Sequence, residues 1–390
     1  MKSIDTRRAL GLILMGTGLL VAAFCLLGRL NRSAQGAPTP QPNHGPLVPT
    51  SIGQARPDRS TLPGASTPAA ASSSQLATPP IAPSLYAPRQ RVCVGVGMPF
   101  PEQAAKSLSE LGPGWYLDWQ AGFPVSPGIT EYAQMVRVPR GEIVPDLKTI
   151  AQIAQRNPGA LWLIGNEMDV IWQDNATPEQ YAAAYHEAYN TLKQADPSSR
   201  VAIGGVSEPS PLRLRYLDRV LQAYREKYGQ AMPIDVWNVH NFILPEERGS
   251  WGVDIPPGIE ATRGLTYTIQ DHDNLNTFKQ QLIDFRRWMA RHGYRDKELL
   301  VSEYGILMYE DYGFDYPRVR DFMLGSFDVM LNTTDAESGL PADGNRLVQR
   351  WCWYSLADDD YPTGNLAEVN GGELTPLGRD FKVYPDRQSP

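Results

Sequence analysis

Two glutamates end apolar runs of the sequence, and their carboxyl groups could perform acid–base and nucleophilic chemistry together. Glu167 follows the run at 162–166, and Glu303 follows the run at 299–302. One carboxylic acid can protonate a departing group while a second, ionised carboxylate attacks the substrate. A single glutamate in such a position is commonly a solvated strand-end or helix-start residue. Two of them favour a site, because burying an unpaired ionisable group costs several kcal/mol.

Motifs of other common chemistries do not occur in the sequence. It contains no Gly-x-Ser-x-Gly elbow, no Walker loop and no His-Glu-x-x-His. The Gly95-Val96-Gly97 stretch lacks the third glycine of a dinucleotide-binding turn. The three Cys and five scattered His are too few for zinc ribbons or iron–sulfur sites. We therefore expect neither a metal nor a cofactor.

The charge balance indicates which class of partner the chain is expected to bind. Lys and Arg number 36 and Asp and Glu number 43, which gives a net charge of −7 with no dense basic run. Nucleic acid is therefore not the expected partner. Residues 89–390 carry 29 basic (36 − 7) and 41 acidic (43 − 2) side chains, a balance of −12. An acidic domain of this kind suits a neutral ligand better than an anionic one.

Eight β-rich runs alternate with segments of helical spacing, which predicts an α/β fold of the (β/α)8 TIM-barrel type. Helix-start signals at Asp146 and Thr177 and the helical spacing at 275–291 support the alternation. Gly- and Pro-rich flanks around the second and third runs predict short or missing helices there. The eight runs lie at 92–96, 115–119, 135–138, 161–165, 201–205, 234–240, 299–303 and 347–354.

A barrel of this type would place the two glutamates together. Glu167 ends the fourth predicted strand and Glu303 ends the seventh. Side chains at the C-terminal ends of parallel barrel strands converge over one opening, on loops that are free to vary. We therefore expect both carboxyl groups at the same mouth.

These residues resemble the signature of clan A glycoside hydrolases. Gly165-Asn166-Glu167 and Ser302-Glu303-Tyr304-Gly305 are similar to the Asn-Glu and Glu strand ends of that clan, and the likeness spans residues 91–380. His240, the Trp351-Cys352-Trp353-Tyr354 strand and the stretch at 374–378 are also similar. Met168 departs from the pattern, since many relatives carry Pro there, which leaves close subfamily assignment open.

The resemblance implies a retaining hydrolase, with Glu167 as acid/base and Glu303 as nucleophile, and with the acidic balance of the domain we expect a neutral, β-linked glycan as the substrate. Retention needs carboxyl groups about 5 to 5.5 Å apart, whereas inversion needs about 6.5 to 9.5 Å. Glu167 must hold its proton near the working pH, and an ionised Glu303 close by would favour this. A barrel that binds cell-surface polysaccharide without cleaving it is the alternative.

Several further residues are candidates for substrate binding. Asn166 would donate to the sugar 2-hydroxyl, or it is a simple turn residue. Arg137 could reach the mouth and keep Glu303 ionised, or it is an ordinary surface arginine. His240 could bind a sugar hydroxyl or orient Glu303, with Asn238 and Asn241 as alternatives. Tyr304, next to Glu303, is a further candidate contact.

Saccharide clefts commonly use flat aromatic rings, and Trp353 is the favoured platform. Strand alternation places Trp351 and Trp353 on one face and Cys352 on the other, so at least one Trp is expected to point into the barrel. The other candidate rings, each more commonly core or loop filler, are those of Trp115, Trp119, Trp172 and Trp251.

The N-terminal part of the chain differs in composition from the rest. Residues 9–27 are uncharged and mostly apolar, close to the length of a membrane-spanning helix, so we expect residues 1–30 to form an anchor, with a cleaved signal peptide as the alternative. Residues 31–88 contain 12 Pro and few periodic apolar residues, which predicts a disordered linker. The catalytic domain would then be residues 89–390, monomeric and extracytoplasmic, on a membrane or secreted.

Two cysteines fall on neighbouring strands of the predicted barrel. Cys93 on the first strand and Cys352 on the eighth would be about 4.8 Å apart, within disulfide range. Parallel strands seldom offer the torsion that a disulfide needs, so two buried thiols are the favoured expectation. The long stretch at 242–271, after the sixth strand, is expected to cover part of the mouth.

Overall fold

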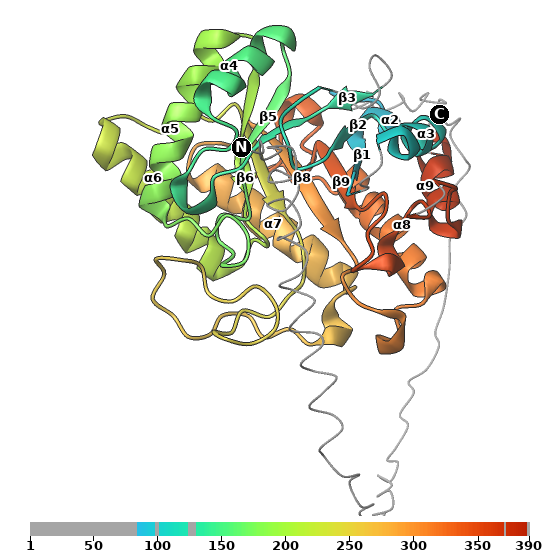
Figure 1. The fold of residues 1–390 in the computed structure, drawn as a ribbon. Coiled ribbons are helices and arrows are strands. Elements are labelled where there is room, and N and C mark those ends of the chain that lie inside the picture. The colour runs from blue at the N-terminus through green and yellow to red at the C-terminus, as the bar shows by residue number, and fades with distance from the viewer. Residues whose placement is uncertain (1–83, 98–100, 124–129, 370–371, 388–390) are drawn as a thin grey trace, which may run out of the picture. The chain divides into compact units, whose positions relative to one another are not determined.

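The computed structural model describes residues 84–97, 101–123, 130–369 and 372–387 (Figure 1). The apolar stretch at 9–27 and the linker up to residue 83 lie outside the described residues, so the anchor and the disordered linker stay predictions. Within the described ranges, no helix is both long and apolar enough to cross a bilayer.

Nine strands form one sheet in the order β3-β2-β1-β9-β8-β7-β6-β5-β4, and all of their pairings are parallel. Only Ala133 separates β3 from β4, so the two edges of the sheet belong to one stretch of chain and the sheet closes into a barrel. Counting β3 and β4 together leaves eight barrel strands, each matching one predicted run. The strands are β1 (Val92–Gly95), β2 (Trp115–Leu117), β3 (Glu131–Tyr132), β4 (Gln134–Val136), β5 (Leu161–Asn166), β6 (Arg200–Gly205), β7 (Val236–His240), β8 (Glu298–Gly305) and β9 (Arg350–Tyr354).

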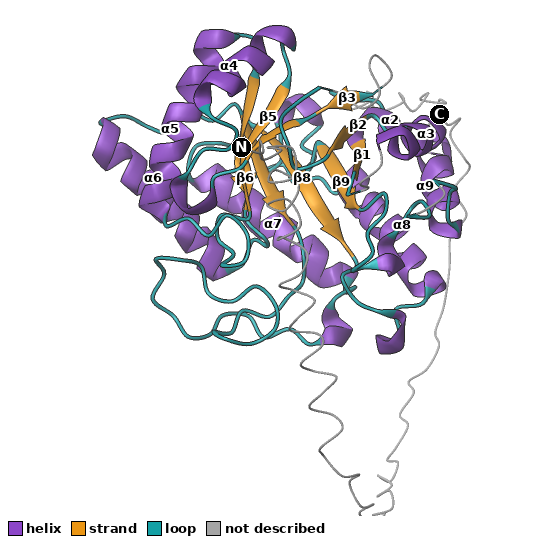
Figure 2. Ribbon diagram, in the orientation of Figure 1, coloured by secondary structure: helices purple, strands orange, loops and turns teal. Residues whose placement is uncertain are grey.

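Helices follow most of the strands and surround the barrel (Figure 2). The predicted start signals are used: Asp146 caps α4 and Thr177 closes a capping box on α5. Among the described residues between β2 and β3 no helix occurs, as the Gly- and Pro-rich flanks predict. The helices are α2 (Pro88–Arg91), α3 (Pro101–Leu111), α4 (Leu147–Arg156), α5 (Pro178–Ala195), α6 (Pro211–Tyr228), α7 (Leu275–Arg291), α8 (Tyr316–Asn332) and α9 (Pro376–Arg387).

The strands bury side chains on both faces, as expected for a parallel barrel. One buried cluster contains no helix residue and is therefore the barrel interior. The other joins the outward faces of the strands to the helices, and it includes Trp162 and Trp237. The interior cluster consists of Cys93, Trp115, Leu117, Ala133, Met135, Leu161, Leu163, Ala202, Val236, Leu300 and Cys352.

Cys93 and Cys352 form a disulfide, so the expectation of two free thiols is wrong. The reason is the register of β1 and β9, which pairs these two residues directly, with their Cα atoms 4.1 Å apart. Both side chains also point into the barrel interior. The bond therefore joins β1 to β9, the first and last strands among the described residues.

The end of the barrel where the strands begin is closed by charged residues. Leu85 N and Arg91 donate to the Asp343 carboxylate, and the Arg91 and Asp343 side chains are buried. Tyr86 Oη donates to Glu298 Oε2 at 2.8 Å. These contacts attach the start of the described chain to the end of the barrel opposite the predicted mouth.

The long loop between β7 and α7 contains one short 3₁₀ helix, Ile269–Asp271. Figure 1 shows it beyond the ends of the strands. Arg213 of α6 holds it, since Nη2 donates to the backbone oxygens of Val253 (3.0 Å) and Asp254 (3.2 Å), and the guanidinium also pairs with Glu246. The predicted long insertion is therefore present and anchored to the helix layer.

Candidate active site

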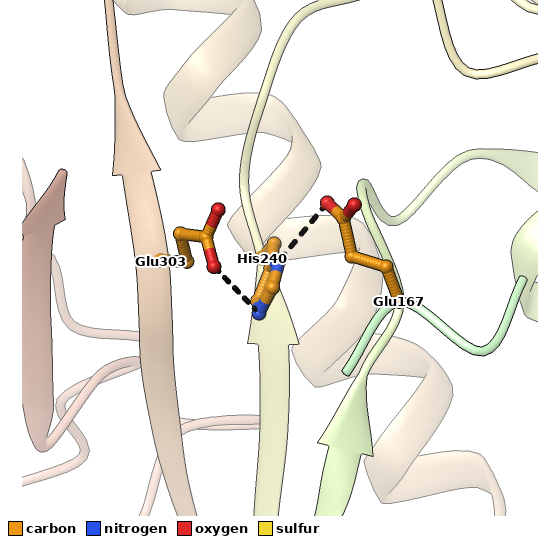
Figure 3. A group of neighbouring side chains, drawn as sticks. All are labelled: Glu167, His240 and Glu303. Carbon is orange, nitrogen blue, oxygen red and sulfur yellow. Dashed lines mark hydrogen bonds and ion pairs between the residues drawn. The ribbon is translucent and has the colours of Figure 1, made fainter. Parts of the chain in front are cut away.

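Three side chains meet where β5, β7 and β8 end: Glu167, His240 and Glu303 (Figure 3). One oxygen of each glutamate and one nitrogen of His240 all lie within 4.8 Å of one another. The structure thus places the two predicted carboxyl groups across one opening, with the imidazole ring between them. This arrangement can bind, hold and move protons.

A bulge in β8 aims Glu303. Val301 is level with Trp351 on β9, but the next pair is Tyr304 with Trp353, so β8 has one residue more than its neighbour. On the other side, His240 is level with Glu303. Strict alternation would place Glu303 on the outward face with Val301. The bulge re-aims the strand end and brings Glu303 toward the mouth.

The end of β5 is bent by two residues in the left-handed region. Gly165 has φ +94°, and a Cβ there would lie 2.9 Å from the Tyr181 ring, so only glycine fits. Glu167 has φ 44°. Asp174 secures this turn by accepting from the backbone N–H of Asn166 (2.8 Å) and of Val138 (2.9 Å). The turn places the Glu167 side chain at the mouth.

Asn166 is buried beside Glu167, and its Oδ1 has no hydrogen-bond partner among the described residues. Its backbone is held through Asp174, as described above. The contacts described for the fold therefore do not use the side-chain amide, which leaves it able to bind a ligand.

His240 links the two carboxyl groups. Its Nδ1 lies 3.1 Å from Glu167 Oε1, and its Nε2 lies 3.9 Å from Glu303 Oε2. Burial lowers the pKa of His240, but the charges of Glu303 and Glu167 outweigh burial, so the net pKa is raised. Gly205 leaves room for the ring, since a Cβ there would lie 2.4 Å from His240 Cδ2.

Glu303 lies in an environment that favours its neutral form. Burial raises its pKa to about 7, and the charge of Glu167 acts in the same direction. The charge of His240, a hydrogen bond from Trp119 and the charge of Arg137 act against this rise. The sequence-based expectation of a readily ionised Glu303 therefore holds only above neutral pH.

Trp119, which the sequence ranked among the weaker aromatic candidates, lies in direct contact with Glu303. Its Nε1–H donates to Glu303 Oε2 at 2.8 Å. Its ring packs against the barrel interior and meets Tyr354 edge-on, with centroids 5.5 Å apart. The available signal was its position just past the end of β2, at the same mouth as the two glutamates.

Arg137 is not bonded to Glu303, so the expected direct contact is wrong. Its Nε donates to Asp174 at 2.8 Å, and its Nη2 donates to Gln173 at 3.1 Å. Asp174 is fully buried and needs a cation, and it therefore holds the guanidinium away from the glutamate. The charge of Arg137 still acts on Glu303 at longer range.

Trp353 and Tyr304 do not face the mouth, which corrects two of the predicted substrate contacts. Both are fully buried in the helix layer with ring centroids 5.5 Å apart. Trp353 Nε1 donates to the Gly364 oxygen at 2.8 Å, and Ser326 Oγ donates to Tyr304 Oη at 3.2 Å. The register that turns Cys352 inward turns the flanking Trp353 outward, and the β8 bulge does the same to Tyr304.

Tyr354 takes the place expected for a tryptophan. It follows Cys352 by two residues, so alternation puts both on the inward face. The residue is partly exposed, and Tyr354 Oη donates to Asp358 Oδ2 at 2.5 Å. Burial and the Asp358 charge raise its pKa well above the usual value. Its ring is therefore a neutral aromatic surface beside Trp119.

Glu167, His240 and Glu303 are residue types that also bind metals. However, the ring of His240 turns a different nitrogen to each carboxylate (Figure 3). A single metal ion would engage only one of these nitrogens. One ligand atom from each of the three residues lies within 4.8 Å of the others, so the group could exchange protons or hold a metal ion.

A buried charge cluster supports the loop that carries Glu167. Asp169 accepts from Arg213 Nε at 2.7 Å and from Ser207 Oγ at 2.9 Å, and both ions are fully buried. Glu208 joins the cluster, and burial raises its pKa well above the usual value. The sequence contains no pattern that predicts these long-range pairs.

The fold was compared with solved structures, and several glycoside hydrolases are similar. A GH128 (subgroup II) endo-β-1,3-glucanase from Sorangium cellulosum matches with a TM-score of 0.51 at 17% identity, over 76% of this chain and 98% of that chain. A GH128 (subgroup II) endo-β-1,3-glucanase from Pseudomonas viridiflava matches with a TM-score of 0.49 at 16% identity, over 76% and 97%. A GH128 (subgroup I) endo-β-1,3-glucanase from Amycolatopsis mediterranei, in complex with laminaritriose, matches with 0.49 at 16%, over 76% and 99%.

No family model matches the chain, and no curated protein does. At 17% identity, the likeness to the Sorangium structure shows a shared fold, the parallel barrel surrounded by helices.

Proposed function

We propose that this chain is a glycoside hydrolase that cleaves a neutral, β-linked glucan. The observation that carries the proposal is the pair of carboxyl groups, Glu167 and Glu303, that face each other at one mouth with His240 between them. The shared fold makes β-1,3-glucan the first substrate class to test, because the Sorangium protein is named for that activity. The acidic balance of residues 89–390 suits a neutral polymer.

The spacing of the two carboxyl groups supports a retaining reaction. An oxygen of Glu167 and an oxygen of Glu303 lie within 4.8 Å of each other. Retaining enzymes hold their carboxyl groups about 5 to 5.5 Å apart, whereas inverting enzymes leave about 6.5 to 9.5 Å for a water molecule. The shorter spacing favours direct attack by a carboxylate.

The reaction then runs in two displacements. The protonated Glu167 gives its proton to the glycosidic oxygen as the ionised Glu303 bonds to the anomeric carbon, and the carbon–oxygen bond to the leaving sugar breaks. In the second step Glu167 takes a proton from water, and the water oxygen replaces Glu303 on the anomeric carbon. His240 positions both carboxyl groups and offsets their negative charge.

Three side chains are suited to hold the sugar. The amide of Asn166 lies beside Glu167 and can bind the hydroxyl next to the reacting carbon, a contact that strengthens in the transition state. The rings of Tyr354 and Trp119 form an aromatic wall on the Glu303 side. Flat rings of this kind pack against the apolar C–H faces of sugars.

The test compares wild type with Glu303→Gln, Glu167→Gln and Glu226→Gln on β-1,3-glucan, xylan, mannan and aryl β-glycosides, with released reducing sugar as the readout. Glu226 lies exposed on α6, so Glu226→Gln is the matched control. We expect turnover by wild type and the control, and a loss of at least about a thousandfold in the two site variants. Binding without turnover by wild type would instead favour the non-catalytic polysaccharide-binding barrel.

We propose further that the barrel works outside the cytoplasm, on a membrane or secreted, as a monomer. The Cys93–Cys352 disulfide supports this location, because disulfides persist in oxidising compartments. The apolar stretch at 9–27 supports an anchor or signal segment. Protease digestion of the domain in intact and in lysed cells tests the location.

A further inference from the structure

Glu303 is largely buried, with 12% of its side chain exposed, and its nearest cationic partner, His240, lies at ion-pair rather than hydrogen-bond distance. Among the hydrogen bonds of the described residues, its carboxyl group accepts one, from Trp119 Nε1 at 2.8 Å. Arg137 is bonded to Asp174 instead, and His240 Nε2 lies 3.9 Å away, beyond hydrogen-bond range. The orientation of Glu303 therefore depends on the indole N–H.

The turn that carries Trp119 is fixed by hydrogen bonds to β3 and β4, which together form the third strand of the barrel. Trp119 itself lies in the left-handed region with φ 57°. On either side of it, Asp118 accepts from Tyr132 Oη at 2.6 Å, and the Gln120 oxygen accepts from Met135 N at 2.8 Å. These hydrogen bonds hold the backbone of the turn in place, and the turn sets the direction in which the Trp119 side chain points.

The ring is held on two sides as well. A Cβ at Gly95 would lie 2.8 Å from Trp119 Cη2, so the ring occupies the space that this glycine leaves open. Tyr354 meets it edge-on at 5.5 Å. A side chain held in this way donates its hydrogen bond with little loss of freedom when Glu303 becomes charged.

We propose that Trp119 is a positioning residue that holds Oε2 of Glu303 through its indole N–H and favours the ionised carboxylate. This proposal rests on the proposed function, since it assigns Trp119 a part in activating the nucleophile. The face of the ring can contact sugar while the N–H binds Glu303.

Other groups around Glu303 remain when the indole N–H is removed. The titratable and charged groups that face it from the neighbouring strands are Glu167 just after β5, His240 on β7, Arg137 beyond β4 and Tyr354 on β9. The hydrogen bond from Trp119 lowers the pKa of Glu303, which burial has raised to about 7. Its loss raises that pKa further, so the nucleophile becomes ionised only at a higher pH.

The experiment is the pH dependence of kcat/KM for β-1,3-glucan hydrolysis by full-length wild type, Trp119→Phe and Trp288→Phe. Trp288 is the matched control, because its Nε1 donates to the Asp218 carboxylate at the same distance of 2.8 Å, on α7 outside the barrel. On the acidic side of the pH profile, we expect kcat/KM to fall with a midpoint near pH 7 in wild type and in the control; this fall is the acidic limb. In Trp119→Phe we expect this limb to move up by about one to two pH units.

A limb that stays in place in Trp119→Phe overturns the proposal, and so does an equal loss of kcat/KM at every pH. If Trp119→Phe does not fold, Gly95→Ala keeps the indole but displaces it, and it must move the limb in the same direction. An unmoved limb in a folded Gly95→Ala protein would count against the proposal.

A second readout separates this proposal from the proposed function. In protein labelled with ¹³C at the glutamate carboxyl carbons, the Glu303 signal is assigned by its loss in Glu303→Gln and titrated without substrate. A higher midpoint in Trp119→Phe than in wild type supports the hydrogen bond even if no glycan is cleaved. Equal midpoints overturn the proposal even if hydrolysis is observed.

Discussion

Burial raises the pKa of Glu303 to about 7, and the charge of Glu167 adds to this effect. His240, Trp119 and Arg137 oppose the rise without cancelling it. The ionised carboxylate is therefore less stable in the folded protein than in water. A nucleophile with this property is reactive because the surroundings solvate its charge poorly, and the same property makes the site unfavourable for folding.

Because ionised Glu303 is unfavourable for folding, we predict that Glu303→Gln stabilises the protein at alkaline pH. Between about pH 4.5 and 7, the Glu303 carboxyl binds more protons in the folded chain than in the unfolded chain. Its contribution to the free energy of unfolding is therefore complete below pH 4.5 and is lost as the pH rises through about 7. We expect Glu303→Gln to raise the free energy of unfolding by about 2 kcal/mol at pH 8, with little effect at pH 4. Urea unfolding at both pH values measures this, with the exposed Glu226→Gln as control. A Glu303→Gln protein less stable than wild type at pH 8 would contradict the account.

At the scale of elements, two local departures from regular strand geometry create the site. The β8 bulge brings Glu303 toward the mouth, and the left-handed residues Gly165 and Glu167 turn the end of β5. Apolar runs followed by Glu predicted that both carboxyl groups lie at strand ends. Alternation alone does not tell which face of a strand points inward, and this is why Trp353 was expected at the mouth, whereas Tyr304 was a candidate only as the neighbour of Glu303.

The close contact between β6 and β7 predicts that Gly205→Ala damages the site. A Cβ at Gly205 would lie 2.4 Å from His240 Cδ2, so the ring must move away from its place between the carboxyl groups. Overpacking of this kind costs about 1 to 3 kcal/mol of stability. We also expect kcat/KM to fall by about a hundredfold or more. Gly122→Ala is the matched control, because a Cβ there meets nothing within 4 Å. Equal activity of the two variants would show that the position of His240 does not matter.

Trp119 and the Asp169–Arg213 pair illustrate what sequence patterns miss. The Trp119 contact to Glu303 joins residues 184 positions apart, and the Asp169 contact to Arg213 joins residues 44 apart. Neither pair has a periodic or motif-like spacing. Such contacts depend on turn conformation and strand register. The sequence does not specify either of these, and both are seen only in the closed barrel.

At the scale of the whole molecule, the order of strands and helices was predictable because hydrophobic periodicity and helix caps are local signals. Closure is not local: it joins β1 to β9, and the pairing of Cys93 with Cys352 reflects a register that the sequence does not specify. The buried Arg91–Asp343 pair likewise ties the start of the described chain to a distant segment.

The disulfide predicts a large contribution to stability, because it joins residues 259 positions apart. In the chain-entropy account, a cross-link closing a long loop stabilises the fold by roughly 2 to 5 kcal/mol. We expect the free energy of unfolding of the Cys93→Ser, Cys352→Ser double variant, measured with urea without reductant, to be lower than that of oxidised wild type by that amount. A double variant as stable as oxidised wild type would show that the barrel closes without the bond.

The central claim is that Glu167 and Glu303 act as a retaining pair across one mouth, and the anomeric form of the first product tests it most directly. Proton NMR during β-1,3-glucan hydrolysis by wild type should show the β-anomer first, with the α-anomer appearing later through mutarotation. Initial formation of the α-anomer would contradict the account, because it would require a water molecule between the two carboxyl groups.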